Sequence, residues 1–143
     1  MRLTDTNRVM IVEDASEIQA LLYRLLTAHG FVVECAQNGL DALEKLRRSE
    51  VLPSVILLDI MMPIMDGFKF RDHQLRDAQL AQVPVIVMTA SANISSGAVV
   101  GEAQGFVKKP FLDLDALVNM VRRLAKSCVP AELPPENVAL GSV

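Results

Sequence analysis

Short apolar runs alternate with amphipathic segments along the chain. The runs are rich in Val, Ile and Leu and are bounded by polar or turn residues, which predicts β-strands. The segments between them repeat apolar residues at i, i+3 and i+4, which predicts helices. The expected strands cover residues 9–12, 32–36, 54–59, 84–89 and 106–108, and the expected helices cover residues 16–29, 40–48, 68–80, 91–105 and 114–126.

Local signals mark where some of these helices begin and end. Ser16 and Gln19 match the S-x-x-Q capping box, which predicts a helix start. Gly30 follows this helix and predicts a C-terminal cap. Asn38-Gly39 predicts a turn before the second helix. These signals give the first two helices well-defined ends.

Two of the expected helices have weaker patterns. Residues 68–80 have an apolar side formed by Phe68, Leu75 and Leu80, but Gln74 interrupts it. Residues 91–105 carry one charge, three glycines and several small residues, so that we expect a short or irregular helix.

Strands that alternate with helices predict an α/β fold with a doubly wound five-stranded parallel sheet. Residues 54–59 support this architecture because the run is apolar on both faces, as in a strand covered on both sides. We expect an N-terminal tail over residues 1–7 and a single domain over residues 8–127. Residues 128–143 contain three prolines and no periodicity, which predicts a tail or linker.

Composition excludes several classes of protein. The 143 residues carry 14 Lys and Arg against 17 Asp and Glu, a net charge of −3, which does not favour nucleic acid. No apolar run is long enough to cross a membrane, and the polar start lacks a signal-peptide core. Cys35 and Cys128 form no metal or disulfide pattern, so we expect a cytoplasmic protein.

Polar residues stand where the predicted strands end. Glu13-Asp14 follows the first strand, Asp59 ends the third, Thr89 ends the fourth, and Lys109 follows the fifth. Because the carboxyl ends of parallel strands meet at one edge of the sheet, we expect these groups to converge. Crowded carboxylates favour a hard cation such as Mg²⁺. The set therefore predicts phosphoryl transfer, with Asp59 as nucleophile, Thr89 as hydrogen-bond donor and Lys109 as positive charge.

The same motifs resemble the receiver domains of two-component response regulators, which are CheY-like. The resemblance covers residues 8–126 and implies the (βα)5 flavodoxin-like receiver fold. It rests on residues 9–14, on the D-x-x-M-P-x-M-D-G pattern of residues 59–67, on Met88-Thr89-Ala90 and on Lys109-Pro110-Phe111.

The resemblance implies roles for the acidic residues. Asp59 matches the phosphoacceptor, and Glu13 and Asp14 match the acidic pair. Mg²⁺ would be bound directly by Asp14, by Asp59 and by the backbone carbonyl of Met61, with Glu13 acting largely through bound water. The family often has two aspartates at the end of the first strand, and Glu-Asp is a variant that should still bind the metal.

The resemblance also implies a switch. Thr89 matches the switch hydroxyl, Lys109 the phosphate-binding lysine and Phe106 the switch aromatic, although a phenylalanine offers no hydroxyl. When Asp59 is phosphorylated, we expect Thr89 to move towards it and Phe106 to turn inwards from a partly exposed position. We also expect a cis bond between Lys109 and Pro110, since a tight turn must follow Lys109 while its side chain points into the site.

The implied function is that of a phosphoacceptor signalling domain, not an enzyme, which catalyses only its own phosphorylation and dephosphorylation. The phosphoryl donor would be a phosphohistidine on a sensor histidine kinase or phosphotransfer protein. The domain would act alone or as a relay intermediate on a downstream protein, without direct contact to nucleic acid.

Three alternatives stay open. The chain could be the receiver part of a larger multidomain regulator or hybrid kinase, with Pro134-Pro135 opening a linker. It could be an aspartyl-phosphate hydrolase, but those enzymes resemble a D-x-D pattern, and Met61 stands where the second acid is needed. A degenerate receiver that only binds partners is the third, and the presence of all the site residues speaks against it.

Overall fold

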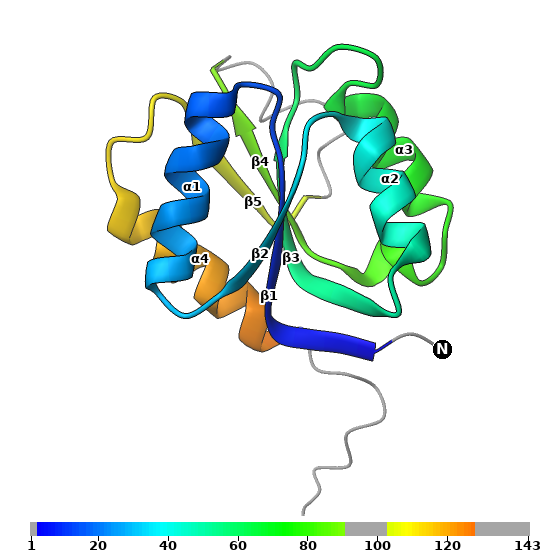
Figure 1. Ribbon diagram of the computed structural model, residues 1–143, viewed down its shortest axis with the longest axis horizontal. Helices are drawn as coiled ribbons and strands as arrows, with labels where there is room; N and C mark the ends of the chain where they lie inside the picture. The colour runs from blue at the N-terminus through cyan, green and yellow to red at the C-terminus, as the bar shows by residue number, and fades with distance from the viewer. Residues whose placement is uncertain (1–2, 91–102, 128–143) are drawn as a thin grey trace, which may run out of the picture.

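The computed structural model describes residues 3–90 and 103–127, which form one five-stranded sheet with the strand order β2-β1-β3-β4-β5 (Figure 1). Every neighbouring pair of strands is parallel. The elements are β1 (Leu3–Val12), α1 (Ser16–Ala28), β2 (Val32–Ala36), α2 (Gly39–Arg48), β3 (Val51–Asp59), α3 (Gly67–Leu75), the 3-10 helix η1 (Leu80–Gln82), β4 (Val85–Thr89), β5 (Gly105–Lys108) and α4 (Leu114–Ser127).

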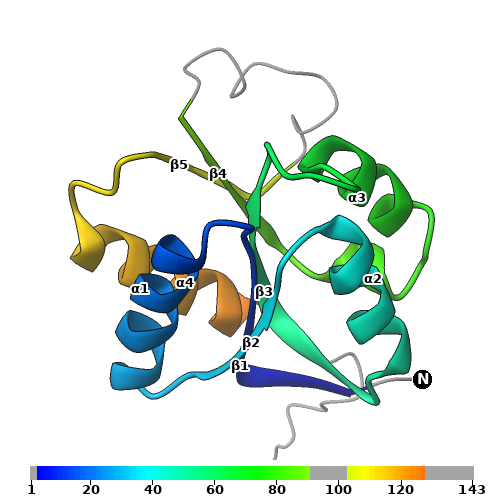
Figure 2. The ribbon, with the colours of Figure 1, turned by 45° about the horizontal axis from the view of Figure 1, so that its top comes forward.

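Helices cover both faces of the sheet. In both ribbon views α1 and α4 lie on one side and α2 and α3 on the other (Figures 1 and 2). The alternation of β1 explains the two layers: Met10 and Val12 join the core beneath α2 and α3, whereas Val9 and Ile11 join the core beneath α1 and α4. The predicted doubly wound α/β fold is confirmed.

Strand β1 begins at Leu3, so the predicted N-terminal tail over residues 1–7 is wrong from residue 3 onwards. The early part of β1 pairs with β3, with Leu3 opposite Val51 and Asp5 opposite Pro53. The register between these strands then shifts before Val9, so the irregularity lies next to the proline that cannot donate to the ladder. This polar segment joins the sheet through backbone pairing, although it contains no apolar run.

The predicted helix starts and stops are partly confirmed. Helix α1 begins at Ser16, but the capping box does not form, since the N-cap is Ala15 and makes no side-chain cap hydrogen bond. At the other end Gly30 has φ of 94°, and the N–H groups of Gly30 and Phe31 donate to Thr27 and Leu26, which closes the helix as expected. The Asn38 side chain caps α2 by accepting from the N–H of Asp41 at 2.8 Å.

Helix α3 is shorter than predicted, and its buried side is different. Leu75, expected on the apolar side, is 40% exposed, while Phe70 and Gln74 are fully buried. The Gln74 amide donates to the carbonyls of Leu80 and Val83 at 2.8 and 3.0 Å and accepts from Arg71. These bonds satisfy a buried polar side chain, which explains why an apparent interruption of the pattern is an inward-facing position.

The remaining predictions concern segments that lie partly or wholly outside the described residues, and the closing helix. The predicted helix over residues 91–105 lies outside them up to residue 102, and Gly105 already belongs to β5. The predicted tail over residues 128–143 also lies outside them. Helix α4 covers the predicted closing helix.

Candidate functional site

Three carboxylates meet at the carboxyl edge of the sheet. Asp59 is the last residue of β3, and Glu13 and Asp14 directly follow the neighbouring strand β1. One oxygen of each of the three carboxylates lies within 4.8 Å of the others. Glu13 and Asp59 are buried, with relative exposures of 1% and 5%, whereas Asp14 is exposed. The sheet order thus brings together side chains that are 45 residues and more apart in the sequence, as predicted from the strand ends.

Lys109 is the cationic side of this cluster. Its Nζ lies 2.7 Å from Oε1 of Glu13 and 3.3 Å from Oδ1 of Asp59. The backbone holds it there, because the N–H of Lys109 donates to the carbonyl of Thr89 at 2.8 Å. The Lys109–Pro110 peptide bond is cis, as expected. Thr89 itself ends β4 and is buried beside the site.

Burial and charge set the protonation of this group. The pKa of Asp59 is raised to about 7, first by desolvation and then by the nearby charge of Glu13, while Lys109 opposes both. Burial lowers the pKa of Lys109, but its hydrogen bond to Glu13 and the charges of Asp59 and Glu13 outweigh burial, so that the net pKa is raised. The lysine therefore stays charged, while Asp59 carries unfavourable negative charge that a further cation would relieve.

The loop after β3 packs closely on Asp59. The N–H of Gly67 donates to the carbonyl of Ile60 at 2.8 Å, and a Cβ at Gly67 would lie only 2.6 Å from the backbone oxygen of Asp59. The next acid in the motif, Asp66, is the N-cap of α3 and accepts from the N–H of Lys69 at 2.9 Å. The two aspartates of the motif therefore have different surroundings: Asp59 lies in the cluster and Asp66 begins a helix.

The remaining predicted site residues surround this centre. Met61, whose backbone carbonyl is expected to bind the metal, has a side chain that is 73% exposed, in the loop directly after Asp59. Phe106 lies on the edge strand β5, is half-buried and packs against the core beneath α2 and α3.

Two features of the site have no local signal in the sequence. The first is the direct ion pair between Glu13 and Lys109. The resemblance gave no reason to expect it, because it implies that Glu13 acts largely through bound water. The other oxygen of Glu13 accepts from the N–H of Ala15 at 3.1 Å, so this carboxylate also shapes its own loop. The second is the side chain of Gln19, which donates to the backbone carbonyl of Glu13 at 3.0 Å. Both contacts depend on how β1, α1 and β5 are placed, and spacing alone does not reveal them.

The arrangement can hold a hard divalent cation and react through a carboxylate. Three carboxylates provide the oxygen ligands that Mg²⁺ prefers, and a lysine stands beside the buried Asp59. The fold and the site define a class of protein: a doubly wound α/β domain with an acidic phosphoryl-transfer site at the carboxyl ends of its strands. The chain belongs to the response regulator receiver domain family, whose model matches residues 9–122.

Relatives with known names agree with this assignment. The chain is similar to the regulatory protein AtoC of Escherichia coli (strain K12), with 38% identity over 127 residues, which are 85% of this chain and 26% of that protein. It is 33% identical over 130 residues to the response regulator MprA of Mycobacterium sp. (strain KMS), which is 89% of this chain and 54% of that protein. The chain thus spans about half or less of the curated relatives that it matches here.

Solved structures have the same fold. The signal receiver domain of a signal transduction histidine kinase from Syntrophus aciditrophicus superposes with a TM-score of 0.77 and 26% identity, covering 95% of this chain and 99% of that one. The response regulator TrrA from Thermotoga maritima, solved in complex with Mg²⁺ and BeF, has a TM-score of 0.74 and 26% identity, covering 82% and 98%. Receiver domains are signalling domains, and they bind Mg²⁺ at an acidic site.

Within residues 3–90 and 103–127, no helix is both long and apolar enough to span a membrane.

Proposed function

We propose that Asp59 is the phosphoacceptor of this receiver domain. The observation that carries the proposal is the position of this buried carboxylate, which lies beside the acidic pair and 3.3 Å from the ammonium group of Lys109. A nucleophile for phosphoryl transfer needs nearby positive charge, because the incoming group carries its own negative charge. Among the three clustered carboxylates, Asp59 is the one that contacts Lys109 and also ends a central strand.

Mg²⁺ would be held directly by Asp14, by Asp59 and by the backbone carbonyl of Met61, and Glu13 would act largely through bound water. The fit rests on the donor set, since the carboxylate oxygens of Glu13, Asp14 and Asp59 lie within 4.8 Å of one another. Bound Mg²⁺ supplies positive charge that stabilises the oxygens of the transferring phosphoryl group. Asp14 is the exposed member, so it faces the solvent from which the cation arrives.

The reaction of the chain is a displacement at phosphorus. A carboxylate oxygen of Asp59 attacks the phosphorus of a phosphohistidine, the P–O bond forms as the P–N bond breaks, and the electron pair of the broken bond goes to the imidazole. Lys109 provides a fixed charge next to the new acyl phosphate. Ionised Asp59 is the reactive form, and its raised pKa makes neutralisation by Lys109 and the cation important.

Thr89 and Phe106 would transmit the change. Thr89 ends β4 next to β5, where Phe106 pairs with Val87 and is half-buried. A shift of the Thr89 hydroxyl towards the phosphoryl oxygens vacates space, and burial favours an inward Phe106 ring. A beryllofluoride mimic of the phosphoryl group should change hydrogen exchange along β5 in the wild type. Unchanged exchange in Thr89→Ala, with the mimic still bound at Asp59, would support this path.

The partner that fits this chemistry is a protein carrying phosphohistidine, as expected for a histidine kinase or phosphotransfer protein. We place the domain in the cytoplasm with that partner, and assign it no reaction on a separate substrate. We also propose that this domain does not itself bind nucleic acid, on the ground of its net charge of −3. The hydrolase alternative is weaker, because Met61 stands where its acid would have to be.

The direct test is labelling with acetyl phosphate. Intact mass of the chain should rise by one phosphoryl group when Mg²⁺ is present, and EDTA should prevent the rise. Asp59→Asn should abolish labelling. Asp66→Asn is a matched control, since Asp66 belongs to the same motif but caps α3, and this variant should still be labelled. Labelling of Asp59→Asn at the wild-type rate would overturn the assignment.

A further inference from the structure

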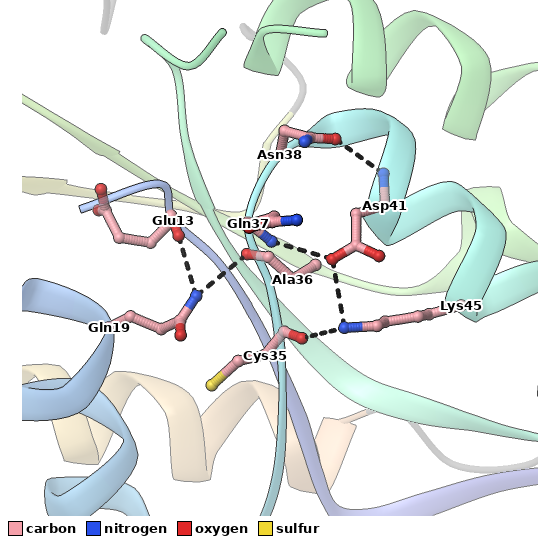
Figure 3. A network of polar contacts seen from close by, with 8 residues as sticks. All are labelled: Glu13, Gln19, Cys35, Ala36, Gln37, Asn38, Asp41 and Lys45. Carbon is pink, nitrogen blue, oxygen red and sulfur yellow. Dashed lines mark hydrogen bonds and ion pairs between the residues drawn. The ribbon is translucent and has the colours of Figure 1, made fainter. Parts of the chain in front are cut away.

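Gln19 joins the ends of two strands at the rim of the acidic site (Figure 3). Its side-chain amide, at the end of the first turn of α1, donates to the carbonyl of Glu13 at 3.0 Å and to the carbonyl of Ala36 at 3.4 Å. Ala36 ends β2 and also accepts from the backbone N–H of Glu13 at 3.0 Å. A single half-buried side chain therefore contacts the ends of both β1 and β2.

These bonds fix the backbone of Glu13 on both sides. Its N–H is held by Ala36 and its C=O by Gln19. The carbonyl of Glu13 lies in the planar peptide unit that continues to Asp14. Holding this oxygen therefore fixes the orientation of the peptide plane that contains the Cα of Asp14, to which the exposed Asp14 side chain is attached.

The carboxylate of Glu13 depends on the same loop geometry. One of its oxygens accepts from the N–H of Ala15 at 3.1 Å, and the other accepts from Lys109 at 2.7 Å. If the loop of residues 13–15 changes its direction, the carboxylates of Glu13 and Asp14 move relative to Asp59. The cluster of oxygens within 4.8 Å is therefore maintained by a residue that contributes no oxygen to it.

We propose that Gln19 is a positioning residue for the metal site: its amide holds the end of β1 so that Glu13 and Asp14 face Asp59. This proposal deepens the proposed function and rests on it. Without the amide the loop still folds, because the Glu13–Ala36 backbone bond remains, but it samples more orientations. The expected defect is weaker binding of Mg²⁺ and not a slower chemical step once Mg²⁺ is bound.

The test compares two Gln→Met substitutions of equal shape change. Gln19→Met removes both hydrogen bonds. Gln37→Met is the matched control, because Gln37 lies beside Ala36 and is exposed, and its contact to Asp41 uses the backbone N–H (Figure 3). Titration calorimetry would measure Mg²⁺ affinity, and acetyl phosphate labelling would be followed against Mg²⁺ concentration.

For Gln19→Met we expect the half-saturating Mg²⁺ concentration to rise about three- to tenfold, the effect of losing roughly one net hydrogen bond. The labelling rate at saturating Mg²⁺ should stay within about twofold of the wild type. A general loss of folding would lower this rate as well as the Mg²⁺ affinity. Gln37→Met should match the wild type in both. Unchanged Mg²⁺ affinity in Gln19→Met would overturn the proposal, as would an equal loss in both variants.

A measurement without metal separates this proposal from the proposed function. Hydrogen exchange in EDTA should be faster at the amide of Ala15 in Gln19→Met than in the wild type or Gln37→Met, because that amide reports on the loop. Failure of the wild type to bind Mg²⁺ or to be labelled would overturn the proposed function. Unchanged exchange at Ala15 would instead overturn the anchoring role of Gln19.

Discussion

Lys109 and Glu13, which are 96 residues apart in the sequence, form a partly buried ion pair with a distance of 2.7 Å between Nζ and Oε1. The same ammonium group lies 3.3 Å from Asp59, so it neutralises the inner part of the acidic cluster in the absence of a metal. Asp14, the exposed acid, is the member that this lysine does not contact among the ion pairs described. In the site, the buried carboxylates of Glu13 and Asp59 are thus neutralised by Lys109, whereas the exposed carboxylate of Asp14 is not.

Lys109→Met should destabilise the metal-free protein. Removing the ammonium group leaves Glu13 and Asp59 as neighbouring buried carboxylates, which costs about 2 kcal/mol of unfolding free energy at pH 8. Urea unfolding in EDTA would measure the loss. The control is Lys108→Met, which changes the exposed neighbour and should cost less than about 0.5 kcal/mol. Equal losses in the two variants would contradict this role of the ion pairs.

The stability of the metal-free protein should fall as pH rises from 5 to 8. The folded-state pKa of Asp59 is raised from 3.8 to about 7, so between these values the folded chain binds a proton that the unfolded chain has released. Asp59→Asn should remove this component and be more stable than the wild type by about 2 kcal/mol at pH 8, with a smaller difference at pH 5.

The measurement is urea unfolding in EDTA at several pH values. Asp72→Asn serves as the control, because Asp72 is exposed and its ion pair with Arg76 lies on the surface of α3. A pH-independent difference between Asp59→Asn and the wild type would show that ionisation of Asp59 is not the cause. A large loss of stability in Asp59→Asn would show that Asp59 has a structural role instead.

Mg²⁺ should raise the melting temperature more than NaCl of equal ionic strength. A ligand that binds only the folded state stabilises it by mass action, by about 2.7 kcal/mol at 100 times its Kd. Asp59→Asn should lose most of this gain, whereas Asp66→Asn should keep it, since Asp66 caps α3. Thermal unfolding followed by circular dichroism is sufficient, and an identical shift with both salts would exclude a specific site.

Ile64→Gly should stabilise the protein. Ile64 has φ of 68°, a left-handed conformation that is unfavourable for a β-branched residue, and its side chain is 77% exposed and gains little from packing. Glycine removes the steric cost but increases the conformational entropy of the unfolded chain, which opposes the gain. The net stabilisation should be about 0.5–1 kcal/mol. Leu112→Gly is the control, because Leu112 is 93% exposed in another loop and has no positive φ. That variant should be no more stable than the wild type in urea unfolding.

The strand pattern and the strand-end residues were predictable because they follow from short-range rules. An apolar run predicts a strand, and the parallel arrangement then brings Asp59 to the same edge as Glu13 and Asp14. The roles assigned to Met61 and Phe106, and the switch role of Thr89, came from the resemblance to receiver domains and stay predictions. The extension of β1 to Leu3 was missed, because backbone pairing with β3 does not require apolar side chains.

Gln74 and Gln19 illustrate what only the tertiary structure decided. Gln74 reads as an interruption of a helical pattern, yet it is buried because the carbonyls of Leu80 and Val83 accept from its amide. Gln19 reads as part of a capping box, yet its amide donates to Glu13 and to Ala36, 17 residues away. A polar side chain has several local partners of similar energy, and the choice among them depends on which backbone groups the packed strands bring within reach. The sequence by itself therefore determined the order of elements and the acidic edge, whereas the packing of β1 against β2 and the approach of β5 decided which polar groups hold that edge in place.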